Sequence, residues 1–580
     1  MLRLILVMFS VFACCLLWNS ALQAAPIPVP TRLAIGDGSG WSFAGGKWVE
    51  NQPGDKPVNV REIHSSAFFE EGVIMPPDKR DLHTRAFFTA KGYKDFTAEF
   101  EYNANYRENG GGIAGMILRS TDSNHFYFVY FPWIGQQWRA GHFWAAIAKV
   151  EGDGYIRNIK MAYVPGVPSE VDRWYKVQIE AKGPQISVKV NGRKALSVVD
   201  STYKSGCVGL AGYGMYYFRN VIITGASVKP PVWSAKATIP THSFNVGLNS
   251  SPSPSGCMAP NGDVLLFGAS LASGNAAIAR SKDQGRTWSL EELPDKMHNE
   301  VIYRTRDGRL MFHRYHHSPG VYMSESKDNG KTWSDTFSAK MPEDWPRDSG
   351  NMVAYGPLIE TEDGTQLRFI MGSAMEKGAK YDDIHTWGAV HAKAYAIRST
   401  DGGKSWSLPI EIDRPIEWTY PAGAKRGHVP GSLDMTEVTG VAMGNRVTVV
   451  VRPTYESTMW QCWSDDAGAT WDAAAHTSFA GYAQSTIRTS SGYIVVAHRY
   501  PQYSVNVSRD NGLNWDEGAL IDCPSWAMGC MVEVAPDVVL CTYMNAASGD
   551  IGLFTKQPLL AQLFRVTKDR IVPLDPKGKW

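Results

Sequence analysis

The chain contains 580 residues, of which 44% are hydrophobic, 12% aromatic and 20% charged. Its 58 Lys and Arg residues balance 57 Asp and Glu residues, which leaves a formal net charge of +1. This balance excludes a polybasic nucleic-acid-binding protein and an acidic disordered tail, and the aromatic content excludes a disordered chain. At about 150 residues per domain, the length corresponds to two to four domains.

Residues 1–25 have the organisation of a secretory signal peptide. One basic residue, Arg3, precedes an apolar run over 4–18, and small residues end the segment. The apolar run is shorter than the roughly 20 residues that a membrane-spanning helix needs, which favours cleavage over a membrane anchor. We therefore expect a secreted or periplasmic protein, with a lipoprotein as the alternative because the segment contains Cys14-Cys15.

Residues 31–228 are predicted to form a β-rich domain. Apolar and polar residues alternate over 172–179 and 186–190, as expected for half-buried strands, and Asn191-Gly192 is a hairpin-turn pair. This order of strands resembles a concanavalin-type or laminin-G-like jelly roll, which is also found in domains for keto-disaccharide hydrolysis. The proline-containing segment 229–239 is predicted to be a stiff linker.

Jelly rolls of this kind often bind sugars through exposed aromatic rings. Aromatic side chains also fill the cores of β-sandwiches, so core packing is the alternative role for each of them. The candidates for sugar stacking are Trp133, Trp138, Trp144 and Tyr155.

Six cysteines remain after the predicted cleavage. An even number in an exported protein permits disulfide bonds, but their spacing does not define the pairs. No pair has the spacing of a zinc site, so we expect neither a metal nor a cofactor. The six are Cys207, Cys257, Cys462, Cys523, Cys530 and Cys541.

A short pattern, Ser-x-Asp-x-Gly-x-Thr-Trp, occurs five times in the second half of the chain. Ser405 and Asn514 replace the threonine in two of the copies. Successive copies begin 45, 73, 65 and 44 residues apart. A four-stranded propeller blade takes about 40–50 residues, so the spacing predicts one blade per copy, two of them with insertions. The copies span Ser281–Trp288, Ser326–Trp333, Ser399–Trp406, Ser464–Trp471 and Ser508–Trp515.

The repeated residues are those of a tight turn between strands. The Asp side chain can accept hydrogen bonds from turn N–H groups, the Gly can adopt a positive φ, and the Trp can be buried between strands. The pattern therefore predicts a structural role, and residues such as Asp283 and Asp466 are not expected to be catalytic.

The repeats resemble the Asp boxes of the sialidase (neuraminidase) superfamily. The resemblance implies an all-β chain in which a six-bladed β-propeller over residues 240–575 follows the jelly-roll domain. A seven-bladed propeller is the alternative, and its additional blade would lie within 373–433. The inner strands of six blades are expected at about 253–260, 297–303, 350–358, 434–441, 482–488 and 527–534.

In a propeller, the starts of the inner strands and the loops after the second strands line one mouth. Three arginines follow predicted second strands, and a guanidinium group pairs bidentately with a carboxylate. Arginines that converge from several blades therefore favour an acidic sugar as the ligand. The predicted site consists of Glu300, His313, Arg314, Asp434, Glu437, Arg452, Tyr482, His498 and Arg499.

Glu437 and Arg452 match the sialidase pattern best. The resemblance pairs a glutamate that opens an inner strand with an arginine that ends the next strand, and here the two residues lie 15 positions apart around an Asn445-Arg446 turn. By this match Glu437 would polarise a nucleophile and Arg452 would hold the substrate carboxylate. Arg499 would be a further arginine of the same site.

Three sialidase features are missing from their expected positions. The Arg-Ile-Pro motif is replaced by the sequence of 253–258, the first-blade loop 270–275 has no carboxylate, and segment 525–530 lacks the nucleophilic tyrosine. A sialidase-like exo-glycosidase is the first hypothesis. The alternatives are a uronate lyase that uses histidine and tyrosine for proton abstraction, a glycan-binding propeller without catalysis, and a structural or adhesive propeller.

The expected partner is an acidic glycan or polysaccharide. The balanced charge predicts no nucleic-acid binding, and no segment after the signal peptide is long and apolar enough to span a membrane. The sequence contains no heptad pattern, so a monomer is expected.

Overall fold

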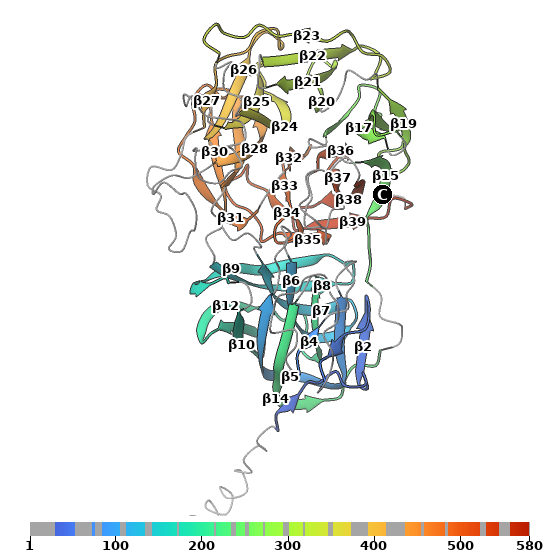
Figure 1. The fold of residues 1–580 in the computed structure, drawn as a ribbon, viewed down its shortest axis with the longest axis vertical. Coiled ribbons are helices and arrows are strands. Elements are labelled where there is room, and N and C mark those ends of the chain that lie inside the picture. The colour runs from blue at the N-terminus through green and yellow to red at the C-terminus, as the bar shows by residue number, and fades with distance from the viewer. Residues whose placement is uncertain are drawn as a thin grey trace, which may run out of the picture.

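The computed structural model contains only β-strands as regular elements of its described residues (Figure 1). No helix in this part of the chain is long and apolar enough to cross a membrane. The predicted signal peptide lies outside the described residues. These residues are 29–52, 72–75, 84–104, 112–133, 142–170, 173–213, 216–233, 239–249, 255–270, 273–293, 301–316, 320–345, 352–372, 393–412, 435–453, 458–481, 485–522, 529–544 and 557–578.

Two layers of antiparallel strands form the N-terminal part, and one long strand, β5 (Thr84–Ala104), belongs to both. The first half of β5 pairs with β2 and β13, and the second half pairs with β10 and β14. The first layer consists of β2 (Trp41–Ala44), β13 (Gly206–Tyr213), β6 (Gly112–Asp122), β7 (His125–Trp133), β8 (His142–Glu151) and β9 (Ile156–Pro168). The second contains β10 (Trp174–Lys182), β11 (Gln185–Val190), β12 (Arg193–Val199), β14 (Tyr216–Val228), β1 (Thr31–Arg32), β4 (Ile74–Met75) and β3 (Val49–Glu50).

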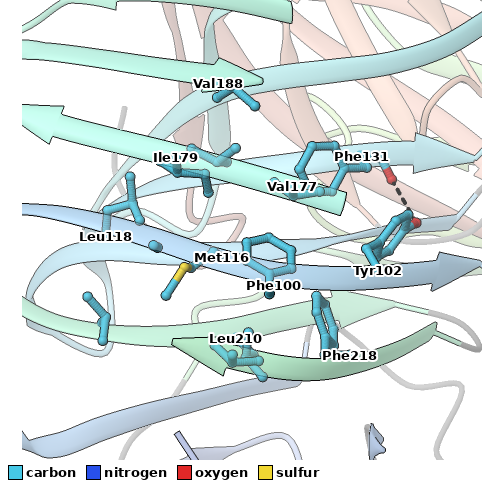
Figure 2. Close-up of a cluster of buried hydrophobic side chains, with 14 of the residues drawn as sticks. Phe100, Tyr102, Met116, Leu118, Phe131, Val177, Ile179, Val188, Leu210 and Phe218 are labelled. Carbon is cyan, nitrogen blue, oxygen red and sulfur yellow. Dashed lines mark hydrogen bonds between the residues drawn. The ribbon is translucent and has the colours of Figure 1, made fainter. Parts of the chain in front are cut away.

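The core lies between these two layers. Alternate residues of β10, such as Val177 and Ile179, are buried, as the period of two along a strand requires. Figure 2 shows Val177 beside Phe100, its partner residue on β5, with Leu210 of β13 in the same apolar cluster. This arrangement is a β-sandwich, and its assignment as a jelly roll remains a prediction.

The C-terminal part contains five four-stranded antiparallel sets and a sixth set that is completed by a strand from the beginning of this part. In the sixth set β15 (Phe244–Asn249) pairs with β38 and also with β17 of the first set. The first three sets are β16–β19 (Ser255–Met258, Val264–Ser270, Ala276–Ser281, Ser289–Glu292), β20–β23 (Val301–Arg304, Leu310–His316, Gly320–Ser326, Phe337–Ser338) and β24–β27 (Met352–Glu360, Gln366–Gly372, Lys393–Ser399, Ile410–Glu411). The next three are β28–β31 (Met435–Met443, Arg446–Pro453, Thr458–Ser464, Ala475–Ala480), β32–β35 (Ser485–Arg488, Ile494–His498, Tyr503–Ser508, Ala519–Asp522) and β36–β39 (Met531–Ala535, Val538–Met544, Pro558–Val566, Ile571–Leu574).

The first strands of the six sets contact one another in succession. β16 contacts β20, β20 contacts β24, and the series continues through β28 and β32 to β36, which contacts β16 again. Each of these strands overlaps one of the six ranges expected for inner strands. Much of the insertion 373–433 lies outside the described residues, and its described part supplies β26 and β27 of the third set.

The five repeats form one hydrogen-bonded turn in five copies. In the second copy the Asp328 carboxylate accepts bonds from the backbone N–H of Thr332 (2.9 Å) and from its hydroxyl (2.6 Å). The Ser326 hydroxyl donates to Asp328 (2.8 Å) and accepts from the N–H of Gly330, whose φ is 79°. The other four copies have the same backbone contacts, and in the fifth the Asn514 side-chain amide donates to Asp510 in place of a hydroxyl. The repeat aspartates are therefore structural, as predicted.

We expect Asp328→Ala to lower the melting temperature by a few degrees, about 2–4 °C, and to leave catalysis unchanged. The hydrogen bonds to Thr332 hold the pKa of Asp328 at about 2, so the carboxylate stabilises the turn above pH 3.8 and loses this contribution as the pH falls towards 2. Thermal unfolding of the variant beside Asp335→Ala, an exposed aspartate of the same segment, tests the role. A loss of activity without a loss of stability would contradict it.

The sandwich and the six sets share a seam. Strand β9 pairs with β35, with Arg157 opposite Ala519 and Ile156 opposite Leu520 (Figure 1). Next to this pairing, the Tyr155 ring is buried among side chains of the fifth and sixth sets, and its hydroxyl donates to Gln562 (2.9 Å). Of the candidate sugar-stacking aromatics, Tyr155 and Trp144 are both buried, whereas the side chains of Trp133 and Trp138 lie outside the described residues.

Five of the six cysteines are described, and all five are free thiols in the structure. Burial raises the pKa of the Cys530 thiol to about 11, so this thiol is uncharged at neutral pH. Cys523 lies outside the described residues.

Candidate functional site

A buried ion pair lies at one end of the fourth set. Strands β28 and β29 form a hairpin, which brings Glu437 near the start of β28 beside Arg452 near the end of β29. Arg452 Nη1 lies 2.7 Å from Glu437 Oε1, and the two side chains are only 6% and 9% exposed. The 15-residue spacing in the sequence thus corresponds to one charge-assisted contact at the end of a hairpin.

Glu437 stands in an unusual backbone conformation. Its φ is 47°, a left-handed value that L-residues adopt at a cost. The pairing of β28 with β29 shifts between Thr436 and Thr439, so Glu437 belongs to a β-bulge. Bulges redirect side chains and concentrate next to active sites. Here the bulge is the local cause that places the carboxylate against Arg452.

A second bulge, in the neighbouring strand β24, presents a tyrosine to the same place. The pairing of β24 with β25 shifts between Tyr355 and Ile359, at a Gly-Pro pair in which Gly356 has a φ of 68°. A Cβ on Gly356 would lie 2.7 Å from the Thr439 side chain, so the two bulges are in close contact. Burial raises the pKa of Tyr355 well above its usual value, the negative charge of Glu437 raises it further, and Arg499 and Arg452 oppose this.

Arg499 reaches this place from the fifth set. It follows the last residue of β33 and is 6% exposed. Burial lowers the pKa of Arg499, while the charge of Glu437 and the Tyr355 phenol raise it. Tyr355, Glu437, Arg452 and Arg499 therefore form one group of interacting side chains from three neighbouring sets, which we call the Glu437 cluster.

A buried arginine, Arg368, donates hydrogen bonds to the backbone at Tyr355. Arg368 on β25 donates from Nη1 to the carbonyl oxygens of Tyr355 (3.2 Å) and Gly356. The side chain is 2% exposed, and burial lowers its pKa to about 10, so it is still a cation at neutral pH. Sequence reasoning missed Tyr355 and Arg368. The Gly356-Pro357 pair inside a predicted inner strand was the available signal, because it marks a bulge.

Two predicted site histidines lie between sets rather than in the Glu437 cluster. His498 stacks on Phe479 of the preceding set (ring centroids 5.4 Å apart), and its Nε2 contacts Asn506 Oδ1 (2.8 Å). His313 packs edge-on against Trp406 of the following set. His498 is the last residue of β33 and Arg499 follows it, and the two consecutive side chains have different surroundings, His498 between the sets and Arg499 in the Glu437 cluster.

The unfolding free energy is expected to fall as the pH decreases from 6.5 to 4. Burial lowers the pKa of His498 to about 4 from 6.5, so the unfolded chain binds this proton first and neutral His498 stabilises the fold only above that range. The shift corresponds to about 3 kcal/mol. Urea unfolding at several pH values gives the unfolding free energy as a function of pH. Between pH 6.5 and 4 this free energy should fall less steeply in His498→Gln than in the wild type, and the same pH dependence in both would contradict this assignment.

The remaining predicted residues are not brought to the cluster by the described part of the chain. Arg314 lies half-buried on β21 of the second set, opposite Tyr322 of β22, without an ion pair to another described residue. Glu300, Asp434 and Tyr482 lie outside the described residues, so their roles stay predictions. Among the residues that are described, no group of three or more His, Cys, Asp or Glu side chains could hold a metal ion.

The Glu437 cluster and the repeats occupy opposite ends of the sheets. β29 ends next to Arg452, and the antiparallel strand β30 runs back and ends at Ser464, where the fourth repeat begins. The side chains at the cluster end of the sheets are suited to two tasks. Guanidinium groups can bind a carboxylate, and a carboxylate beside a phenol can accept the phenol's proton.

Comparison with known proteins gives one family-model match. Residues 35–224 match the model described as a 3-keto-alpha-glucoside-1,2-lyase-like domain. A xyloglucanase from Paenibacillus sp. is 29% identical over 142 residues, which are 23% of this chain and 13% of that protein. The match therefore spans a small part of this curated relative. All four residues of the Glu437 cluster lie outside the range of the family model.

Two sialidases are among the similar solved structures. NanB sialidase from Streptococcus pneumoniae is 10% identical and covers 80% of this chain and 94% of its own, with a TM-score of 0.37. The Hadza microbial sialidase Hz136 is 13% identical and covers 82% of this chain and 93% of its own, with a TM-score of 0.39.

Proposed function

We propose that this chain is a carbohydrate-active enzyme that cleaves a glycosidic bond of an acidic glycan at the Glu437 cluster. In this proposal residues 240–575 form a six-bladed β-propeller, which the succession of contacts from β16 to β36 and back to β16 supports. The names of the matched family model and of the xyloglucanase relative support carbohydrate chemistry. We place the activity outside the cytoplasm, in line with the predicted signal peptide over 1–25.

The observation that carries the proposal is the meeting of two buried guanidinium groups with one carboxylate and one phenol. Arg452 and Arg499 come from successive sets, and both interact with Glu437. Holding these charges in a buried place costs free energy, which a bound carboxylate offsets. A sugar acid such as a sialic or uronic acid has the required carboxylate next to its reacting carbon.

In the hydrolytic reaction, Arg452 and Arg499 hold the substrate carboxylate and thereby fix the sugar ring. The Tyr355 oxygen forms a bond to the anomeric carbon while the bond to the leaving oxygen breaks, and Glu437 accepts the phenol proton. A proton from the solvent side completes the leaving alcohol. Water then attacks the anomeric carbon as its bond to Tyr355 breaks, and the sugar is released. Tyr355 takes its proton back from Glu437, and the proton that the water loses goes to the solvent, which replaces the one used for the leaving alcohol.

Elimination from a uronate is the second candidate. The same juxtaposition of Tyr355 and Glu437 with two arginines suits removal of the proton next to a carboxylate whose charge is neutralised. This reaction consumes no water. Glu437 accepts the proton from C5, the bond from C4 to the glycosidic oxygen breaks as Tyr355 protonates that oxygen, and a double bond forms between C4 and C5. The proton on Glu437 then passes to Tyr355.

A product screen of the purified protein distinguishes the candidates. Sialylated glycans and uronate polysaccharides are incubated with the wild type, Glu437→Gln and Arg452→Ala. Free acidic sugar would establish hydrolysis and ultraviolet absorbance of an unsaturated uronate would establish elimination, and both variants should abolish the product. Glycan binding that depends on Arg452 without any product would instead establish a binding protein. Products that persist in both variants would refute the assignment of the site.

A further inference from the structure

A side chain of the sandwich packs near the connection 499–502, which joins β33 to β34 and contains Arg499. Trp144 on β8 is 6% exposed and belongs to a buried cluster with Ala480 of the fourth set and Tyr500 of the fifth. Met161 of β9 packs against the same cluster. Tyr500 directly follows Arg499, so consecutive residues belong to the seam and to the Glu437 cluster.

The position of Arg499 depends on the packing of the connection 499–502, because no strand contains this residue. It lies beyond the end of β33, and the next strand, β34, begins at Tyr503. The intervening residues are packed rather than paired in a sheet, with Tyr500 4% and Gln502 0% exposed. From the sandwich side, Trp144 joins Tyr500 in one buried cluster.

We propose that Trp144 is a positioning residue for Arg499, and that the sandwich is therefore part of the scaffold of the site rather than a separate sugar-binding module. This inference rests on the proposed function only in that Arg499 binds the substrate carboxylate. Trp144 acts through Tyr500 and does not contact the substrate. Its own sugar-stacking role, which the sequence predicted as one possibility, is replaced by a buried contact across the seam.

The surroundings of Trp144 couple its position to that of Tyr500. Trp144 is braced on its own layer by Tyr163, whose ring lies edge-on at 5.9 Å, and the strand that carries Tyr163 is paired with β35 of the fifth set. Removing the indole leaves a space that Tyr500 can enter, and Arg499 follows because the two residues are consecutive. A displacement of about 1 Å in a substrate-holding group can cost on the order of 10²-fold in rate.

The test compares Trp144→Ala with Trp144→Phe and with a matched control, Trp233→Ala. Trp233 packs on Phe87 of the sandwich (ring centroids 4.6 Å apart) and belongs to a different cluster from Tyr500. The first measurement is backbone hydrogen exchange in residues 498–503 of the full chain. Trp144→Ala should accelerate this exchange at least about tenfold, Trp144→Phe should restore most of the protection, and Trp233→Ala should not change it.

The second measurement is the ratio of affinities for an acidic sugar and its methyl ester, with N-acetylneuraminic acid and glucuronic acid as probes. Trp144→Ala should lower the preference for the acid about tenfold, while Trp233→Ala retains it. Exchange and preference that stay at wild-type values in Trp144→Ala would overturn the inference. If the wild type itself does not prefer the acid, the proposed function fails, and the exchange result alone still decides whether Trp144 positions the Arg499 connection.

Discussion

Tyr355→Phe is expected to lower turnover by about 10²–10⁴-fold while the fold remains intact. The change removes only the phenol oxygen, whose pKa is shifted by the charges of Glu437, Arg452 and Arg499. Because burial and Glu437 keep the pKa of Tyr355 high, the phenol carries its proton at neutral pH and depends on Glu437 to lose it. Steady-state kinetics on the substrate identified by the product screen measure the loss.

Tyr303→Phe is the matched control. Tyr303 is a buried tyrosine of the second set, 5% exposed, and its hydroxyl has no hydrogen-bond partner in the described structure. We expect this variant to keep wild-type turnover. If Tyr355→Phe retains more than about half of the turnover, the phenol is not the reacting group.

Arg452→Ala is expected to lower the free energy of unfolding by about 3–5 kcal/mol, in addition to abolishing activity. The reason is that Glu437 would remain buried without the guanidinium 2.7 Å away, in a strained bulge that the ion pair holds. Urea denaturation measures the loss. The double variant Glu437→Gln, Arg452→Met removes both charges and should recover a substantial part of the stability without recovering activity.

The same strand provides a control for the charge. Arg446, at the other end of β29, forms an exposed pair with Asp465 (3.3 Å, side chains 45% and 72% exposed). Solvent screens such pairs, so Arg446→Ala should cost less than about 1 kcal/mol. Equal losses in Arg446→Ala and Arg452→Ala would mean that the Glu437–Arg452 pair contributes no more than a surface contact.

Most of the strand sets of the C-terminal part could be predicted from the sequence, because the patterns that indicate them lie within short segments of the chain. Each repeat determines its own turn through contacts between residues at most four positions apart, as in Asp328 and Thr332. The Glu437–Arg452 pair was also accessible, because a hairpin with a recognisable turn brings the two residues together. In both cases the distance along the chain determines the distance in space.

The rest of the site depends on contacts that spacing does not encode. Tyr355 meets Glu437 because two bulges in different sets pack together, and the sequence shows only a Gly-Pro pair at one of them. His498 was placed at the correct end of a strand but on the wrong side, since its neighbour Arg499 takes the side of Glu437. Trp144 is buried in one cluster with Tyr500, which lies 356 positions away, at a seam that neither domain pattern predicts.

The measurement that tests the central claim most directly is the binding of an acidic sugar and of its methyl ester to the wild type and to Arg499→Ala. If Arg452 and Arg499 hold a carboxylate, the wild type should bind the acid at least about tenfold more tightly than the ester, and Arg499→Ala should remove most of this difference. Equal binding of acid and ester by the wild type would contradict the account, because the two buried arginines would then serve the fold alone.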